Sequence, residues 1–225
     1  VEDAAQAVDS YFTEKGDSKP LGSMGHLGAM SFHETKNIIS GEGGMLMIND
    51  ERFVERAEII WEKGTNRASF FRGEVDKYGW VDVGSSFLMS ELNAAYLYGQ
   101  LMQMESIQHK RVELYHAYKD FFSATPGLVV PEVPDCATAN GHMFFALAKD
   151  VDHRSRIIKD LKSQGLHAVF HYLSLHKSPV QSDNHDGRDL VHSDHYTDCL
   201  LRFPLYPELD FEAVEGRLKR VEFDD

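Results

Sequence analysis

The sequence predicts an α/β chain with a small α+β domain at its C-terminal end. Short apolar strand candidates alternate with segments of helical spacing along the 225 residues, which is the order expected of α/β proteins. A long helical pattern runs from Ser90 to Phe121 with one break, and it stops at Pro126-Gly127. Because a helix of that length often links two domains, we expect one domain in residues 1–105, and the linking helix with a small domain in residues 106–225.

The first strands surround a glycine turn. Residues 15–28 are rich in glycine and predict turns and short strands. Gly28–Phe32 is small and apolar, and Met45–Ile48 is a short apolar run, so each predicts a strand. The polar stretch between them contains Lys36 and ends in the turn of residues 40–44. The sequence therefore places a lysine between two short strands.

Helical spacing then alternates with loops and strands. Apolar side chains in residues 50–63 recur at three- and four-residue intervals, which predicts a helix. Residues 64–87 are irregular and aromatic-rich, as is typical of a functional loop. After the long helix the sequence predicts strands at 128–130, 142–147 and 168–172, helices at 154–164 and 211–221, and a polar His- and Asp-rich loop at 181–195.

Composition and charge exclude several classes of protein. Hydrophobic residues make up 42% and charged residues 26%, which is ordinary for a soluble globular protein. The net charge of -13 argues against a broad nucleic-acid-binding surface, because such binding depends on Lys and Arg. Two cysteines, Cys136 and Cys199, are too few for a disulfide framework and favour a reducing compartment. We expect a cytoplasmic protein that binds neither nucleic acid nor membrane.

Three polar residues near the first strands are candidates for cofactor chemistry. The position of Lys36 predicts partial burial, which disfavours the charged ammonium and favours a nucleophilic amine. Asp3 is expected in a restricted environment, where a carboxylate can stabilise a protonated pyridine ring. Ser31 precedes Lys36 by five positions and can donate its hydroxyl to a phosphate. Seen singly, each is more often an exposed lysine, a cap or a turn hydroxyl.

Several segments resemble the DegT/DnrJ/EryC1/StrS family of sugar aminotransferases. They are VEDAAQA (1–7), GHLGAMSFHETKNIISGEGGMLMIND (25–50), VDVGSSFLMSELNAA (81–95), VFHYLSLH (169–176) and LRFPLYPEL (201–209). The resemblance implies a fold-type-I transferase that depends on pyridoxal 5'-phosphate (PLP). Residues 1–105 would be the later part of its large PLP-binding domain, and residues 106–225 the linking helix and the small C-terminal domain.

The resemblance also implies roles for individual residues. Lys36 matches the lysine that holds PLP as a Schiff base, and Asp3 matches the partner of the pyridinium nitrogen. Gln6 matches a residue that contacts the hydroxyl side of the ring, and Ser31 matches a phosphate ligand. A dehydratase branch of the family has histidine in place of Lys36, so the lysine implies transamination.

The loop around Ser86 departs from the pattern of many relatives. They have an Asn-aromatic-Arg run that reaches the neighbouring subunit's cofactor phosphate, whereas this chain has Ser86-Phe87-Leu88. Ser86 is the candidate for that contact, and this form resembles the branch of dTDP-4-amino-4,6-dideoxygalactose transaminases. Family chains extend upstream of the Asp3 motif, where they supply a phosphate-binding turn and a ring that stacks on PLP. We expect the present chain to lack that part.

The reaction and the partners follow from the same resemblance. It implies transfer of an amino group from glutamate to a 4-keto-6-deoxy sugar linked to dTDP, by a homodimer with active sites at its interface. His171, Tyr172 and His176 lie in the segment that would approach the nucleotide sugar. Two alternatives stay open. The enzyme acts at another position of a keto-sugar, or the chain is a truncated, catalytically silent fragment that associates through exposed apolar surface.

A His-rich stretch offers a further alternative. His185, His192, His195 and Cys199 carry ligand types that suit zinc. Their spacing matches no tight Cys/His pairing, and the surrounding loop is polar and acidic. We therefore expect a solvated loop and no metal, while a zinc-binding module stays a third alternative that metal analysis would test.

Overall fold

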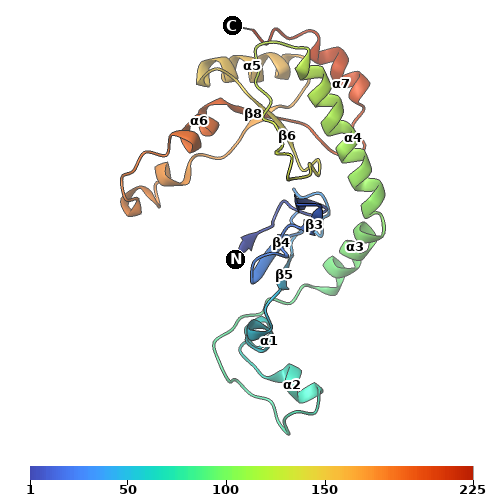
Figure 1. Ribbon diagram of the computed structural model, residues 1–225, viewed down its shortest axis with the longest axis vertical. Coiled ribbons are helices and arrows are strands. Elements are labelled where there is room, and N and C mark those ends of the chain that lie inside the picture. The colour runs from blue at the N-terminus through green and yellow to red at the C-terminus, as the bar shows by residue number, and fades with distance from the viewer. Residues whose placement is uncertain (225) are drawn as a thin grey trace. The chain divides into compact units, whose positions relative to one another are not determined.

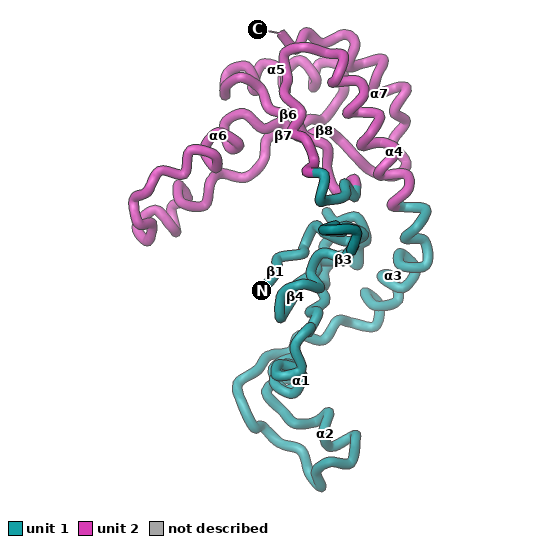
Figure 2. Tube along the Cα trace, viewed as in Figure 1, with its two compact units in different colours: residues 1–107, 135–140 teal, residues 108–134, 141–225 magenta. Residues whose placement is uncertain are grey.

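The computed structural model describes residues 1–224 and divides into two compact units, which Figure 2 distinguishes by colour. Unit 1 comprises residues 1–107 and 135–140, and unit 2 comprises residues 108–134 and the chain from Gly141 onward. Figure 1 labels most of the helices and strands of both units. The strands of unit 1 precede its helices, whereas strands and helices alternate along unit 2. The chain as a whole is thus of mixed α/β composition.

Unit 1 is built on a three-stranded sheet of β1 (Glu2–Asp3), β4 (Leu27–Ser31) and β5 (Gly44–Ile48), in the order β1-β4-β5. β1 runs parallel to β4, and β5 runs antiparallel to it. Both strands that were predicted around the glycine turn are therefore confirmed. The absence of a side chain at Gly28 allows the backbone of Gly22, in the loop before β4, to lie against this strand. A Cβ at position 28 would lie 2.2 Å from the carbonyl oxygen of Gly22.

A hairpin of β2 (Tyr11–Glu14) and β3 (Asp17–Pro20) forms a second, two-stranded sheet. Its turn residues Lys15 and Gly16 have φ of 52° and 85°, the left-handed conformation that a two-residue hairpin turn favours. The sequence predicted turns and short strands from residue 15 onward, but it did not indicate β2. Four residues are too few for a clear alternation of apolar and polar side chains.

The helices of unit 1 follow its sheet. η1 (Glu51–Phe53) leads into α1 (Val54–Trp61), and α2 (Arg67–Phe71) and α3 (Glu91–Met102) come next. Ser90 caps α3, since its Oγ accepts the Asn93 N–H at 3.2 Å. The predicted helices are confirmed. The aromatic-rich stretch is not wholly irregular, because it contains α2, whose 5 residues are too short to show a period.

The long helix has the break that the sequence predicted. α4 (Met104–Ser123) begins directly after Gln103, whose φ of -106° and ψ of 7° end α3. Leu114, Tyr118 and Phe122 recur every four residues along α4 and are all buried. Because side chains four apart share one face of a helix, this spacing gives α4 an apolar stripe for the core of unit 2.

Unit 2 has an antiparallel sheet of β6 (Phe144–Leu147), β8 (Leu200–Phe203) and β7 (Val169–Phe170), in that order. Its core includes residues from α4, from α5 (Val151–Ser163) and from α7 (Phe211–Leu218). The helices α5 and α7 and the outer strands β6 and β7 match predicted elements within a few residues. The unit is thus a small α+β domain.

The C-terminal half differs from the prediction in three places. The remaining elements are η2 (Leu175–Lys177), η3 (Ser182–Asn184) and α6 (Val191–Cys199). The predicted loop at 181–195 therefore contains η3 and the start of α6, which was hidden because α6 is largely polar. The central strand β8 was not predicted. The strand predicted at 128–130 is reduced to a single bridge between Val129 and Leu147.

Aromatic rings dominate the core of unit 2. Tyr118 stacks on Phe144, with ring centroids 4.9 Å apart and an interplanar angle of 14°. Phe122 lies 4.8 Å from Phe203, measured between centroids. The Tyr118 hydroxyl donates to the carbonyl oxygen of Pro204 at 2.8 Å. The polar end of a buried tyrosine is therefore satisfied while its ring packs in the core.

Unit 1, in contrast, buries few large apolar side chains. Among the described residues its large buried hydrophobic side chains are Phe32 and Ile38, which are 6% and 1% exposed. Trp80, Val83 and Leu92 are 83%, 83% and 84% exposed. The apolar groups of unit 1 therefore lie largely at its surface.

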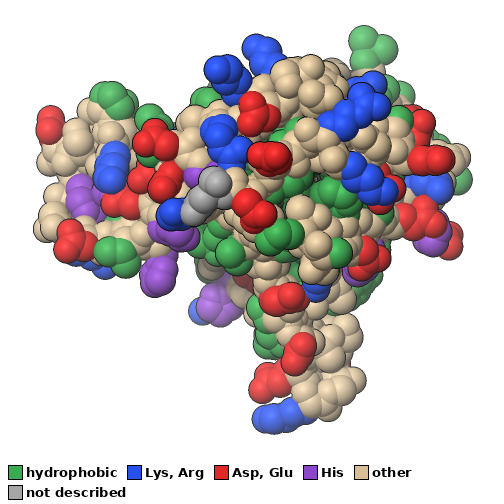
Figure 3. All heavy atoms as spheres, turned by 90° about the horizontal axis from the view of Figure 1, so that it is seen from above, with side chains coloured by type: hydrophobic (Ala, Val, Ile, Leu, Met, Phe, Trp, Pro, Cys, Tyr) green, Lys and Arg blue, Asp and Glu red, His purple; other side chains and the backbone are tan. Residues whose placement is uncertain are grey.

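The surface mixes charges of both signs. Figure 3 shows one face of the molecule, on which Lys and Arg side chains are interspersed with Asp and Glu side chains. In the part of the chain that the structure describes, the helices are too short or too polar to cross a membrane.

Candidate functional site

Asp3 and Ser31 lie on one face of the unit 1 sheet. Asp3 pairs with Ala29 on β4, and Ser31 follows two residues further along that strand. Because side chains alternate in direction along a strand, all three point to the same side. Asp3 is nevertheless exposed, so the restricted environment expected for its carboxylate is wrong for the described chain. β1 has a single neighbouring strand there, which leaves its other edge open.

Lys36 lies in a loop, residues 32–43, that hydrogen bonds close at its base. The Phe32 N–H donates to the Gly43 carbonyl at 2.8 Å, and the Ser40 N–H donates to the Phe32 carbonyl at 2.7 Å. Gly43 has a φ of 151°, in the region that favours glycine. The Lys36 side chain is half-buried, as its place beside a glycine turn predicted.

Lys36, Gln6 and Ser31 line one small pocket together with Ala4. Its volume is about 10 Å³, roughly that of one water molecule. The structure therefore brings three of the predicted cofactor residues together, and strand pairing places Asp3 on the same face as Ser31.

The donor set fits PLP. The cofactor requires an amine for its Schiff base, an acid for its ring nitrogen and donors for its phosphate. Lys36, Asp3 and Ser31 supply these groups. Ser31 Oγ accepts the His33 N–H at 3.3 Å, and a hydroxyl that accepts in this way keeps its own proton to donate. Ala4 and Ala5, which have small side chains, also line the pocket beside Lys36 and Ser31.

Two asparagines beside Lys36 were missed by the sequence analysis. Asn37 Nδ2 donates to the backbone carbonyl of Asn140 at 2.8 Å. Asn140 Nδ2 donates to the carbonyls of Gln6 at 2.7 Å and Val8 at 2.8 Å. Asn37 and Asn140 are 103 positions apart, so no local pattern relates them. They meet because residues 135–140 return to unit 1 and pair along β2.

Glu2 and Asn49 hold the loop that precedes β4. The Glu2 carboxylate accepts the N–H groups of Gly22 at 2.8 Å, Met24 at 2.7 Å and Gly25. The Gly25 N–H, followed by the Gly22 N–H, contributes most to lowering the pKa of Glu2. Asn49 Nδ2 donates to the carbonyls of Gly22 at 2.9 Å and Gly25 at 2.8 Å. Backbone donors of this loop are thus satisfied by Glu2 on β1, and backbone acceptors by Asn49, which follows β5.

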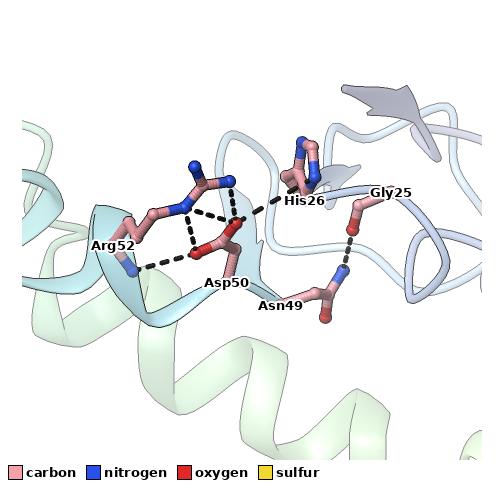
Figure 4. Close-up of polar contacts among 5 residues, drawn as sticks. All are labelled: Gly25, His26, Asn49, Asp50 and Arg52. Carbon is pink, nitrogen blue, oxygen red and sulfur yellow. Dashed lines mark hydrogen bonds and ion pairs between the residues drawn. The ribbon is translucent and has the colours of Figure 1, made fainter.

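The end of β5 is fixed by Asp50, as Figure 4 shows. Arg52 Nε donates to both carboxylate oxygens of Asp50 at 3.0 Å, and the Arg52 N–H donates to Oδ1 at 3.0 Å. The side-chain hydrogen bonds from Arg52 are the largest cause of the lowering of the Asp50 pKa to about 2. His26 Nε2 lies 4.0 Å from Oδ2. Asp50 therefore stays ionised where β5 turns into η1.

Ser86 lies outside the set of residues that line the Lys36 pocket. It is exposed and forms an isolated bridge with Glu62, beside a hydrogen bond from the Phe87 N–H to the Trp61 carbonyl at 3.1 Å. Within unit 1 the structure thus does not bring Ser86 together with Lys36. A contact with another subunit's cofactor stays a prediction.

His171 and Tyr172 line a pocket of unit 2. Its volume is about 360 Å³, and the hydroxyl groups of Ser174, Ser193 and Thr197 also line it. Ser174 Oγ lies 2.7 Å from Thr197 Oγ1, and Ser193 Oγ donates to Ser174 Oγ at 3.2 Å. Burial lowers the pKa of His171, and the positive charge of Arg202 lowers that pKa further. The pocket therefore offers hydroxyls and an imidazole to a polar ligand.

His176, the third candidate for contact with the nucleotide sugar, does not line the pocket that His171 and Tyr172 line. Its Nε2 lies 3.1 Å from Asp194 Oδ1, and Lys177 Nζ lies 2.9 Å from Asp194 Oδ2. Asp194 thereby joins η2 to α6. The His176 ring also lies 5.1 Å from the His185 ring, whereas His195 contacts Cys199 at 3.5 Å between Nδ1 and Sγ. Within residues 1–224 no group of three or more such side chains is arranged to hold a metal ion.

Comparison with known proteins identifies the family to which the chain is similar. The DegT/DnrJ/EryC1/StrS aminotransferase family model matches residues 1–221. The spore coat polysaccharide biosynthesis protein SpsC of Bacillus subtilis (strain 168) is 29% identical over 230 residues, which cover 98% of this chain and 58% of SpsC. The dTDP-4-dehydro-2,3,6-trideoxy-D-glucose 4-aminotransferase of Saccharopolyspora spinosa is 24% identical over 219 residues, which cover 95% of this chain and 55% of that protein.

A solved structure shows the same fold. Spr1654 from Streptococcus pneumoniae, in its PLP form, matches with a TM-score of 0.79 at 19% identity, over 96% of this chain and 55% of Spr1654. The chain thus spans a little over half the length of the proteins that it matches. The expected fold-type-I architecture is confirmed. Since the family match runs through nearly every residue, the chain belongs to the DegT/DnrJ/EryC1/StrS aminotransferase family, whose cofactor is PLP.

Proposed function

We propose that this chain is the lysine-bearing part of a PLP-dependent sugar aminotransferase. It moves an amino group from glutamate to the keto carbon of a 4-keto-6-deoxy sugar linked to dTDP. The observation that carries the proposal is the convergence of Lys36, Gln6 and Ser31 on one pocket, on the sheet that also holds Asp3. Residues 1–105 then serve as the cofactor-binding part and residues 106–225 as the linking helix and small domain.

Each residue has a distinct task in this proposal. PLP, when bound, supplies the electron sink for amine exchange. Lys36 Nζ holds the cofactor in the resting enzyme, then accepts and returns a proton at the substrate carbon. The Asp3 carboxylate stabilises positive charge on the ring nitrogen, and Gln6 contacts the hydroxyl side of the ring. Ser31 Oγ donates to the phosphate, using the proton that its contact with the His33 N–H leaves available.

The substrate assignment draws on unit 2. His171 and Tyr172 line a pocket rich in hydroxyl groups, which suits the hydroxyl and phosphate groups of a nucleotide sugar. His176 orients this segment through Asp194. The Saccharopolyspora spinosa relative is named for amino transfer at C4 of a dTDP sugar, which supports C4 rather than another position. The full-length enzyme can be assayed against 4-keto and 3-keto sugars. Identifying the carbon that is aminated then distinguishes transfer at C4 from transfer at another position.

Self-association is part of the proposal. Trp80, Val83, Phe87 and Leu92 are each more than 60% exposed and lie on or near the loop of Ser86. A homodimer that covers these side chains would also carry Ser86 to the partner's cofactor phosphate. Light scattering on the purified protein should give the mass of a dimer, and a monomer at all concentrations would contradict this part. The low cysteine count supports a cytoplasmic setting.

Lysine mapping tests the central proposal. PLP is added to the purified protein, the Schiff base is reduced with borohydride, and the modified lysine is identified by peptide mass spectrometry. The label should fall on Lys36, disappear in Lys36→Ala and persist in Lys63→Ala, which changes an exposed lysine of the same unit. Label distributed over other lysines in proportion to their exposure would overturn the assignment.

The silent-fragment alternative needs a separate measurement. Label on Lys36 without amino transfer from glutamate to any keto-sugar would favour a fragment that binds PLP but does not turn over. Transfer by this chain would exclude that alternative.

A further inference from the structure

Two asparagines join three separate stretches of unit 1 around Lys36. Asn37, which follows Lys36, donates through Nδ2 to the backbone carbonyl of Asn140 at 2.8 Å. Asn140 donates through Nδ2 to the carbonyl oxygens of Gln6 at 2.7 Å and Val8 at 2.8 Å. The Lys36 loop is thereby connected to the segment that follows β1. We refer to Asn37, Asn140 and the three hydrogen bonds described here as the asparagine clamp.

Burial makes these hydrogen bonds specific. The side chains of Asn37 and Asn140 belong to residues that are 5% and 8% exposed. A buried amide that loses its partner costs its full desolvation, so such a group strongly prefers the one geometry in which it is paired. The clamp therefore restricts the position of the Lys36 loop relative to Gln6 and Val8 more strongly than a hydrogen bond at the surface would.

The clamp connects residues that line the Lys36 pocket. Gln6, whose carbonyl accepts from Asn140, lines the same pocket as Lys36 and Asn37. Ile38, 1% exposed, anchors the other side of Asn37 in the interior of unit 1. The backbone hydrogen bonds of the loop itself are internal, since the Glu34 N–H donates to the Gly41 carbonyl at 2.8 Å and the Lys36 N–H donates to the His33 carbonyl at 2.9 Å. Asn37 instead connects the loop, at the position next to the lysine, to a segment outside it.

We propose that Asn37 and Asn140 are positioning residues for Lys36. They hold the Lys36 loop at a fixed separation from Gln6, so that the amine meets the cofactor carbon while Gln6 contacts the ring. This rests on the proposed function of Lys36, although the clamp's effect on the loop can be measured without any cofactor. Residues 135–140 thereby acquire a role in the site, although they lie far from its motifs in the sequence.

Hydrogen exchange of the cofactor-free chain tests the clamp directly. Removing either donor, in Asn37→Ala or Asn140→Ala, should accelerate exchange of amides 33–41 about tenfold, since buried hydrogen bonds are lost. Asn66→Ala is the matched control, because Asn66 also bonds within unit 1, accepting the Gly79 N–H at 2.9 Å, but does not contact the Lys36 loop. Unchanged exchange of amides 33–41 in both clamp variants would overturn the proposal, even if residues 4–8 and 135–140 became faster.

An isosteric variant separates positioning from general loss of structure. Asn140→Asp retains the shape but turns a carboxylate oxygen toward the Gln6 and Val8 carbonyls, so amides 33–41 should exchange faster at neutral pH. Protonation of the introduced carboxyl restores a donor, so exchange should slow again as the pH falls, which Asn140→Ala should not show. Dividing each rate by the wild-type rate at the same pH cancels titration of His33 and Glu42 in this loop. Equal pH profiles for the two variants would contradict the clamp.

Borohydride labelling then connects the clamp to the lysine. In Asn37→Ala and Asn140→Ala the share of PLP label on Lys36 should fall to that of the exposed lysines, while Asn66→Ala retains the wild-type share. Faster loop exchange with an unchanged share of label would show that the clamp does not position Lys36. Absence of label on Lys36 in the wild type would refute the proposed function instead, and the exchange result would still decide the clamp.

Discussion

His171 lies in the hydroxyl-lined pocket of unit 2, half-buried and near the guanidinium of Arg202. Burial and that positive charge both lower its pKa from an ordinary value near 6.5. As the pH falls below that value, the unfolded chain binds a proton before the folded chain does. The free energy of unfolding should therefore decrease between the ordinary pKa and the lowered one, and should be unaffected by His171 above it.

Substituting His171 should remove this contribution. His171→Gln keeps a polar side chain but does not titrate, so urea unfolding at several pH values should show a flatter decline below about pH 6.5 than in the wild type. Ser193→Ala, which removes a hydroxyl from the same pocket but no titratable group, should retain the wild-type slope. A steeper decline in His171→Gln would mean that His171 is instead stabilised in its charged form.

The residues of the Lys36 site differ in how far the sequence could predict them. Lys36 and Ser31 lie five positions apart in one motif, and their roles were implied by the family resemblance of that motif; the structure brings both to one pocket. Asp3 was identified as a candidate, but its exposure was not foreseen, because burial depends on what covers the strand. Asn140 could not be predicted from any local pattern, since it acts through a contact between residues 103 positions apart.

Among the elements, α4 and β6 carry the core of unit 2 through stacked rings. Phe144 is fully buried and stacks on Tyr118. Phe144→Ala should lower the free energy of unfolding by about 3–5 kcal/mol, because the cavity left by a buried ring does not close fully. Tyr118→Phe removes the hydroxyl that donates to Pro204 and should cost about 1 kcal/mol. Denaturant unfolding followed by circular dichroism measures both.

An exposed ring on the same unit provides the control. Tyr172 is 84% exposed, so Tyr172→Phe should change the free energy of unfolding by less than about 0.5 kcal/mol. If Phe144→Ala were as mild as this control, the stacked cluster would not be the core of unit 2.

The strength of local patterns explains which elements the sequence predicted. α3 and α4 show apolar side chains at helical spacing over many residues, so the sequence indicated one long helical pattern with a break, although not the position of the break at Gln103. α6 is composed mainly of polar residues, and Cys199 is its one buried residue among those described, so it lacks the apolar stripe that identifies a helix. β8 follows α6 directly, without a glycine or proline to mark its start. Pairing with β6 and β7, rather than local sequence, defines β8.

At the scale of the whole chain, the two units bury apolar groups very unequally. Unit 2 encloses a continuous cluster drawn from α4, α5, α7, β6 and β8. Unit 1 exposes much of its apolar surface, and a hollow of about 730 Å³ beside β5 and α1 is lined by Leu46, Ile60 and Trp61 among others. Because apolar burial is the main source of stability, unit 1 should open at a lower free-energy cost than unit 2.

Hydrogen exchange can measure this difference strand by strand. At low protein concentration the amides of β4 should exchange at least about tenfold faster than those of β8, although each is the central strand of its sheet. Raising the concentration should slow exchange in unit 1 and leave unit 2 unchanged if association covers Trp80 and Leu92, since binding stabilises the state that it selects. Equal protection of β4 and β8 at low concentration would mean that the hairpin, the asparagine clamp and the Glu2 contacts stabilise unit 1 without a covered apolar face. Slowing in both units together would instead show that opening of the two is coupled, so that covering unit 1 stabilises the whole chain.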